Sequence, residues 1–217
     1  MESSQTQTQQ QSTAEASQLC PSNETLITYR VEYTWYNFKC RIYDDNKTGA
    51  EPLYIADFAK LRKPHAIYKR ADNDQVIGTG TLHFFNIDAD YEIHGRRDTM
   101  VAQKRFSTVY THRSFAMSDT DQPMTMTWTS DSGFKTWDFV CVDENQLPVA
   151  RFSANFWRMV KVGKIEFMGP KADSQALREE LIVAGITLVY HMMVRMNNLL
   201  GLVGALCSSP GHDKKCD

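Results

Sequence analysis

The sequence predicts a mainly β protein, built as a roughly twelve-stranded closed antiparallel barrel that encloses a hydrophobic C-terminal α-helix. Between residues 26 and 167, short half-apolar stretches alternate with turn-forming residues. Residues 174–206 then read as one helix that is apolar nearly all the way round. An open sheet covers only one side of such a helix, whereas a barrel of about eleven or more strands has room for a helix along its axis.

The strands are indicated by apolar residues at every second position. In 124–128, Met124, Met126 and Trp128 alternate with two threonines, and the stretch 137–141 repeats the pattern. A period of two is typical of half-buried strands. Runs rich in Asp, Asn, Ser, Gly and Pro lie between the stretches and predict turns. These runs are 44–49, 72–74, 119–123, 130–133 and 143–145. Their spacing predicts roughly ten to twelve strands joined mostly by hairpins.

The terminal helix is predicted to be buried in the fold. Asp173 or Ser174 can cap its first turn, and the Pro and Gly that follow Ser209 end it. Its longest charge-free apolar run, 181–194, is shorter than the roughly 20 residues that span a bilayer. Arg195 would lie near the middle of a membrane, at a cost of about 2.5–3.5 kcal/mol. Burial in a soluble barrel is therefore favoured over a membrane anchor.

The chain divides into one domain and two tails. Residues 1–24 are rich in Gln, Ser and Thr and are expected to be disordered, residues 25–207 form the barrel with its helix, and residues 208–217 form a flexible tail. The five scattered cysteines show no disulfide framework, and the first residues lack the pattern of a secretory signal. A cytoplasmic protein is expected, with a peripheral membrane location as a further option.

Catalytic and metal-binding patterns are weak. Gly78-Thr79-Gly80 is a fragment of a phosphate-binding motif, but a strand follows where that motif needs a helix, so a bend or a close strand contact is predicted. Four histidines lack the spacing of metal ligands. They are His65, His83, His94 and His112. We expect no enzyme activity, no cofactor and no metal. The net charge of -2 also argues against nucleic acid as a partner.

Seven short motifs follow one another along the chain. They are Phe38-Lys39-Cys40-Arg41-Ile42-Tyr43, Pro52-Leu53-Tyr54, Pro64-His65-Ala66-Ile67-Tyr68, Gly78-Thr79-Gly80-Thr81-Leu82-His83, Ile93-His94-Gly95-Arg96, Val142-Asp143-Glu144-Asn145 and Val149-Ala150-Arg151-Phe152. In this order they resemble the tubby C-terminal-like superfamily, in particular the short single-domain proteins common in fungi. The resemblance covers about residues 26–206. It implies a twelve-stranded barrel around a hydrophobic C-terminal helix, and a relation to LURP-one-related and phospholipid scramblase-like proteins.

The resemblance also implies a non-enzymatic role at membranes, because tubby domains bind phosphoinositide headgroups. A multiply charged headgroup requires converging Lys and Arg donors. Two groups of basic residues are candidates for this contact. They are Lys39, Arg41 and Lys47 in the first group and Lys60, Arg62 and Lys63 in the second. The alternative is that these side chains simply form the polar outer surface of a barrel.

A polar stripe interrupts the apolar helix. Thr187, His191 and Arg195 follow one another at four-residue spacing and therefore share one face. The stripe is explained either by hydrogen bonds to the barrel or by a groove for a ligand or lipid, in which Arg195 contacts an anion and His191 responds to pH.

The sequence thus favours a monomeric, membrane-proximal adaptor or a module that binds phosphoinositide or other anionic lipid. One alternative is a structural or protein-interaction domain without lipid binding. Another is a scramblase-like protein whose terminal helix inserts in a membrane. Cys207, which follows the helix, and Cys216, beside two lysines, are candidates for acylation.

Overall fold

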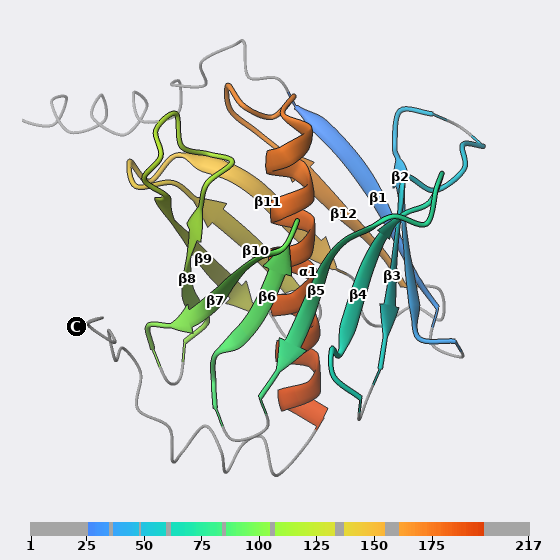
Figure 1. Ribbon diagram of the computed structural model, residues 1–217, viewed down its shortest axis with the longest axis horizontal. Helices are drawn as coiled ribbons and strands as arrows, with labels where there is room; N and C mark the ends of the chain where they lie inside the picture. Colours follow the sequence, from blue (N-terminus) through green and yellow to red (C-terminus); the bar gives the residue numbers. More distant parts are fainter. Residues whose placement is uncertain are drawn as a thin grey trace, which may run out of the picture.

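The computed structural model describes residues 26–34, 37–47, 49–59, 62–83, 86–104, 107–132, 137–154 and 161–197. Within these ranges the chain forms twelve β-strands followed by one α-helix (Figure 1). The elements are β1 (Ile27–Thr34), β2 (Lys39–Asp44), β3 (Tyr54–Phe58), β4 (Ala66–Arg70), β5 (Val76–Leu82), β6 (Ala89–Ile93), β7 (Arg96–Ala102), β8 (Val109–Ser114), β9 (Met124–Ser132), β10 (Trp137–Val142), β11 (Pro148–Ala154), β12 (Lys161–Phe167) and α1 (Gln175–Asn197).

The strands form a closed antiparallel barrel, as predicted. Each strand pairs with its neighbours in sequence, and β1 pairs with both β2 and β12. At this closure Val31 of β1 lies opposite Gly163 on one side and Ile42 on the other. Closure leaves no unpaired sheet edge, which removes the surface through which open sheets associate.

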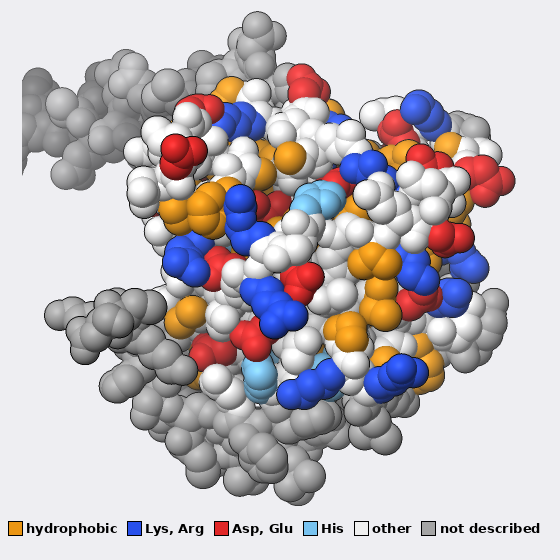
Figure 2. All heavy atoms as spheres, viewed as in Figure 1, with side chains coloured by type: hydrophobic (Ala, Val, Ile, Leu, Met, Phe, Trp, Pro, Cys, Tyr) orange, Lys and Arg blue, Asp and Glu red, His pale blue; other side chains and the backbone are white. Residues whose placement is uncertain are grey.

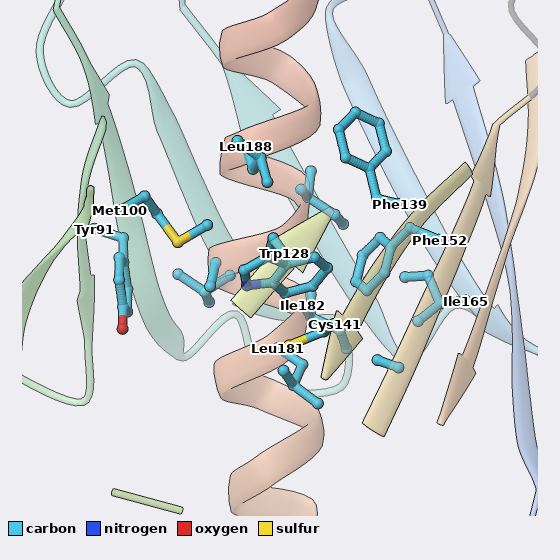
Figure 3. Packing of buried hydrophobic residues seen from close by; sticks show 14 of the residues in the cluster. Tyr91, Met100, Trp128, Phe139, Cys141, Phe152, Ile165, Leu181, Ile182 and Leu188 are labelled. Atoms are coloured by element: carbon cyan, nitrogen blue, oxygen red, sulfur yellow. The ribbon is translucent and has the colours of Figure 1, made fainter. Parts of the chain in front are cut away.

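Helix α1 runs along the inside of the barrel, from the upper end in Figure 1 to the lower end. Leu181, Ile182, Val183 and Ala184 occupy four successive positions and are all 0% exposed. Successive helix residues point about 100° apart, so four of them cover most of the circumference. The helix is therefore covered on all sides. Figure 3 shows aromatic and aliphatic side chains from the strands packed against it.

Glycines bring the wall of the barrel close to the helix. A Cβ atom on Gly80 of β5 would lie 2.5 Å from Oγ1 of Thr187, and one on Gly78 would meet Val183 and a backbone oxygen. On the helix side, a Cβ atom on Gly185 would lie 2.6 Å from the ring of Phe152. The glycine motif in β5 is therefore a site of close packing, against the helix at both glycines and also against the backbone of β6 at Gly78.

Among the described strands, the backbone pairing is shortest between β7 and β8. Only Val101 with Thr111 and Ala102 with Tyr110 are paired across these strands. Toward the helix start, side chains replace the backbone ladder. Asp98 accepts hydrogen bonds from the backbone N–H of Arg113 at 2.9 Å and from its guanidinium at 3.0 Å. The strands thus diverge at the end of the barrel where α1 begins.

The start of the helix agrees with the sequence prediction. Ser174 precedes α1, and its Oγ accepts a 3.4 Å hydrogen bond from the backbone N–H of Leu177. The predicted helical residues 198–206 lie outside the described residues, as do both tails, 1–24 and 208–217. No helix in the described part of the chain combines the length and apolarity needed to cross a membrane.

Candidate functional site

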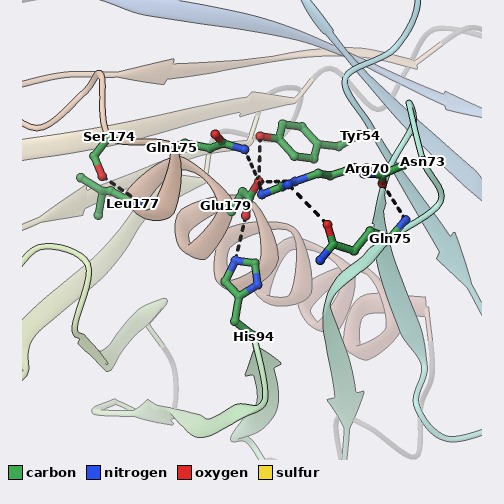
Figure 4. A network of polar contacts seen from close by, with 9 residues as sticks. All are labelled: Tyr54, Arg70, Asn73, Gln75, His94, Ser174, Gln175, Leu177 and Glu179. Carbon is green, nitrogen blue, oxygen red and sulfur yellow. Dashed lines mark hydrogen bonds and ion pairs between the residues drawn. The ribbon is translucent and has the colours of Figure 1, made fainter.

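A network of polar side chains surrounds Glu179 in the first turns of α1 (Figure 4). The Glu179 side chain is 1% exposed. Its Oε1 accepts hydrogen bonds from Nε of Arg70 at 2.9 Å, from Nε2 of Gln175 at 2.9 Å and from the Tyr54 hydroxyl at 3.3 Å. Its Oε2 lies 2.8 Å from Nε2 of His94. The network connects the helix with β3, β4 and the turn after β6.

The charge of Glu179 is stabilised by these neighbours. Burial by itself raises the pKa of the carboxyl, but hydrogen bonds from Gln175 and Arg70, the charge of Arg70 and the hydrogen bond from His94 together hold the pKa below its ordinary value. The cost of burying a carboxylate is offset only when a charged partner and further donors satisfy its oxygens, and Glu179 has both. This network fixes the helix in the barrel.

The turn between β6 and β7 brings His94 to this network. His94 and Gly95 have φ angles of 48° and 80°, both in the left-handed region. Two successive residues of this kind suit a tight hairpin turn. The turn directs the His94 ring toward Glu179 (Figure 4).

A second group of polar side chains lies beside Glu180, the next residue along the helix. Nε1 of Trp128 donates a 3.0 Å hydrogen bond to Nδ1 of His112. An indole N–H is only a donor, so His112 accepts at Nδ1 and, as a neutral ring, carries its proton on Nε2. Nε2 lies 3.8 Å from Oε1 of Glu180, too far for a hydrogen bond. Neither atom has a hydrogen-bond partner among the described residues.

The predicted polar stripe lies inside the barrel and forms hydrogen bonds there. Thr187 shares a 2.8 Å hydrogen bond with the Tyr68 hydroxyl. Nε2 of His191 lies 3.0 Å from the carbonyl oxygen of Ile87, to which it donates. Nη1 of Arg195 donates to the hydroxyl of Tyr110 at 2.8 Å. These bonds favour the explanation by hydrogen bonding to the barrel, and the proposed ligand groove stays a prediction.

His191 is held neutral by its surroundings. Burial, followed by the positive charge of Arg195, lowers its pKa from an ordinary value of 6.5 to about 3, although the hydrogen bond to Ile87 acts in the opposite direction. The ring is 1% exposed. It therefore acts as a neutral hydrogen-bond donor at neutral pH.

The first group of predicted headgroup residues lies on the outside of the barrel. Nζ of Lys39 is 3.2 Å from Oδ1 of Asp57, although this contact lacks hydrogen-bond geometry. Lys47 is 3.4 Å from Asp44 in the turn after β2. Arg41 is half-buried on β2 and forms no ion pair within the described part of the chain. Lys39 and Arg41 are thus brought to one face, and Lys47 lies at the end of that strand.

Two residues of the second predicted group lie within the described part of the chain. Arg62 and Lys63 are exposed, and Lys60 lies outside the described residues. Lys63 lines a shallow groove of about 690 Å³ on the outer wall, together with Arg97 and Arg113. Acids pair with both of these arginines. Figure 2 shows basic and acidic side chains interspersed over the face formed by β4 to β7.

Sequence reasoning missed the two networks at the helix start. Glu179 and Glu180 are adjacent acids at the beginning of a helix that must be covered on all sides. That position signals that strand residues must supply donors. Which strands supply them depends on contacts between residues far apart in the sequence, such as Tyr54 and Glu179.

No protein-family model, no curated protein and no solved structure matches the chain. Within the described residues, no three His, Cys, Asp or Glu side chains are grouped so that they could hold a metal ion. The geometry of this chain is therefore the basis for the functional proposals that follow.

Proposed function

We propose that the protein is a non-enzymatic module that binds anionic lipid headgroups through the outer face of β1 to β4. The observation that supports this most is a local excess of positive charge. Four basic side chains on this face accompany only two acidic ones, Glu32 and Asp57. The basic residues are Arg30, Lys39, Arg41 and Lys69, and we refer to them as the basic face.

Strand register determines this arrangement. Lys39 and Arg41 are two residues apart on β2 and therefore point to the same side. Ile55 of β3 lies opposite Arg41 on one side and opposite Lys69 of β4 on the other. The three basic residues thus lie within three adjacent strands.

Asp57 is shared between two lysines. Its Oδ1 is 3.2 Å from Lys39 and its Oδ2 is 3.3 Å from Lys69. One carboxylate neutralises one of these charges, so the pair keeps a net positive charge that a phosphate group can engage. Glu32 lies opposite Arg41 but contacts Arg30 at 3.3 Å. Arg41 therefore remains available for an anion.

The architecture also supports a relation to the tubby C-terminal-like superfamily, which we propose as the origin of this lipid role. The closed twelve-stranded barrel with its helix along the inside is the fold that the resemblance implies. The basic face includes Lys39 and Arg41, which the resemblance implicates in headgroup contact.

Co-sedimentation with lipid vesicles tests this function. The protein is expected to pellet with phosphatidylcholine vesicles that contain phosphatidylserine or a phosphoinositide, and not with phosphatidylcholine alone. A K39Q/R41Q/K69Q variant should lose most of this binding, because each basic residue near an anionic surface contributes about 1 kcal/mol. The matched control is R97Q/K104Q/R151Q, which removes three exposed charges from β7, the connection after it and β11.

Each outcome decides between the alternatives. Equal pelleting of both triple variants would contradict the basic face as the lipid site. Absence of pelleting on all vesicles would favour the structural or protein-interaction role. Resistance of the pelleted protein to carbonate extraction would favour the scramblase-like role with an inserted helix.

A further inference from the structure

A pocket of about 460 Å³ opens at the end of the barrel where α1 begins. It lies between the turn after β6, the segment that follows β8 and the first turns of the helix. Its lining includes Arg96, Phe115, Asp121, Ala176 and Glu180. The divergence of β7 and β8 makes room for it, because Arg96 begins β7 and Phe115 follows β8 directly. Its volume is in the range that small-molecule sites occupy.

Glu180 contributes an unsatisfied carboxylate to this pocket. The residue is 5% exposed. Its Oε1 is shielded from solvent, faces Nε2 of His112 at 3.8 Å and has no hydrogen-bond partner among the described residues. Its Oε2 accepts one long bond of 3.4 Å from the backbone N–H of Ala116, another residue of the pocket lining. The neighbouring Glu179 is different, since Arg70 provides it with a cationic partner. A buried carboxylate without a charged donor is costly, and a ligand that supplies one would relieve that cost.

No residue in the described part of the chain supplies this donor. His112 is the nearest basic side chain to Oε1, at 3.8 Å. The hydrogen bond from Trp128 occupies Nδ1 of His112, and Nε2 of the same ring is beyond hydrogen-bond distance of Oε1. The guanidinium of Arg96 instead lies 3.8 Å from the centre of the Phe115 ring, over which it stacks.

We propose that this pocket binds the ammonium or guanidinium group of a small alkylamine, with Glu180 as its anionic partner. Two carboxylates, Glu180 and Asp121, line the pocket with one guanidinium, that of Arg96, and with His94, whose Nε2 lies against Glu179. This lining favours a cation over an anion. Asp121 is exposed and forms part of the entrance, whereas Glu180 is buried. Phe115 and Ala116 offer apolar contact to the methylene groups of such a ligand.

Isothermal titration calorimetry with putrescine as the probe and 1,4-butanediol as its neutral isostere tests the proposal. Putrescine should bind and the diol should not. Glu180→Gln should weaken putrescine binding by about ten- to hundredfold, the usual effect of losing a charged hydrogen bond. The matched control is Asp119→Asn, because Asp119 is on the same segment but contacts Lys171 at 2.6 Å. This control should bind putrescine as the wild type does.

Three results would overturn the proposal: equal binding of the diol, unchanged affinity in Glu180→Gln, or an equal loss in the Asp119→Asn control. Ala176→Leu provides a second test should Glu180→Gln not fold. Ala176 is an exposed residue that lines the pocket, so a larger side chain fills the pocket without disturbing the core. Retained putrescine binding in a folded Ala176→Leu protein would contradict the site.

The site is separate from the proposed lipid surface, with which it shares no residue. The K39Q/R41Q/K69Q variant should therefore bind putrescine with wild-type affinity. Failure of either proposal leaves the other intact.

Discussion

At the scale of single residues, the buried charge of Glu179 depends most on Arg70. The guanidinium contacts Oε1 through both Nε, at 2.9 Å, and Nη2, at 2.8 Å. Loss of one partner of a buried ion pair leaves the other charge uncompensated, whereas replacing both by apolar groups is often tolerated.

Arg70→Met should therefore lower the free energy of unfolding by about 3 kcal/mol. This value is at the lower end of the destabilisation seen when a buried ion pair is broken, because Arg70 is partly exposed. Arg70→Met combined with Glu179→Met should recover much of this loss. Urea unfolding of the two single variants, the double variant and the wild type provides the measurement. A double variant that is destabilised by the sum of the two single effects would contradict a direct coupling.

His191 should make stability depend on pH. Its pKa is about 3 in the folded protein and 6.5 ordinarily, so between these values the unfolded chain binds more protons and stability falls as the pH falls. From about pH 7.5 to about pH 5 the loss attributable to His191 is about 2 kcal/mol. His191→Gln should remove this part in urea unfolding at about pH 7.5 and about pH 5.

Other groups do not obscure this comparison. Burial also lowers the pKa of His65, but this contribution is common to the wild type and His191→Gln. The lowered pKa of Glu179 affects stability only below its ordinary value of 4.5, since a depressed carboxyl pKa contributes stability that is lost at more acidic pH. An unchanged pH dependence in His191→Gln would show that the ring is not buried as described.

Residue roles were only partly predictable from the sequence. The four-residue spacing of Thr187, His191 and Arg195 showed that they share one face of a buried helix. Their partners Tyr68, Ile87 and Tyr110 could not be predicted, because each lies 85 or more residues away along the chain.

At the scale of elements, the contact between α1 and β5 depends on the absence of side chains. Gly80 leaves no space for a Cβ atom beside Thr187, and the same holds for Gly185 beside the rings of Phe152 and Trp128. The two contacts differ in what holds the neighbouring side chains in place. Thr187 is bonded to Tyr68, whereas the aromatic rings are fixed by packing on one another at 5.2 Å.

Gly80→Ala and Gly185→Ala should each lower the free energy of unfolding by about 1–3 kcal/mol, as overpacked cores do. Thermal unfolding followed by circular dichroism measures the effect. Gly49→Ala is the contrasting variant, since a Cβ atom there meets nothing within 4 Å and any loss comes from its φ of 73° alone. Wild-type stability in both core variants would mean that the helix and the strands are less tightly packed than the structure shows.

Elements were predicted better than their contacts. Local alternation and turn chemistry are enough to indicate strands such as β9 and β10, and a nearby serine marks the start of α1. The divergence of β7 from β8 has no comparable local signal. There Asp98 accepts hydrogen bonds from the backbone N–H and the guanidinium of Arg113, and which residues meet in this way depends on the register of neighbouring strands.

At the scale of the whole molecule, one physical requirement explains the architecture. A helix that is apolar on every side must be surrounded, and twelve strands in a closed ring surround it. The requirement is a property of the helix alone, so the sequence was sufficient to predict it. The pairing of β1 with β12 joins residues about 140 positions apart, such as Ile27 and Phe167, and no local pattern specifies that register.

Burial throughout the barrel should also protect its thiols. Cys40 and Cys141 are at most 2% exposed, and burial raises the pKa of Cys40 to about 12 and that of Cys141 well above its ordinary value. In a C20S/C207S/C216S variant, both remaining thiols should react with Ellman's reagent only when the protein is unfolded in urea. Rapid reaction of the native protein would contradict an enclosed core.

The central claim is that helix and barrel form one cooperative structure, and hydrogen exchange of the backbone amides in α1 tests it most directly. Amides 181–190 should exchange only through global unfolding, with the same free energy as urea denaturation gives and the same protection as β9 and β10. Exchange of these helix amides at a free energy well below that of the strands would contradict the account, because it would show that the helix leaves the barrel while the barrel remains folded.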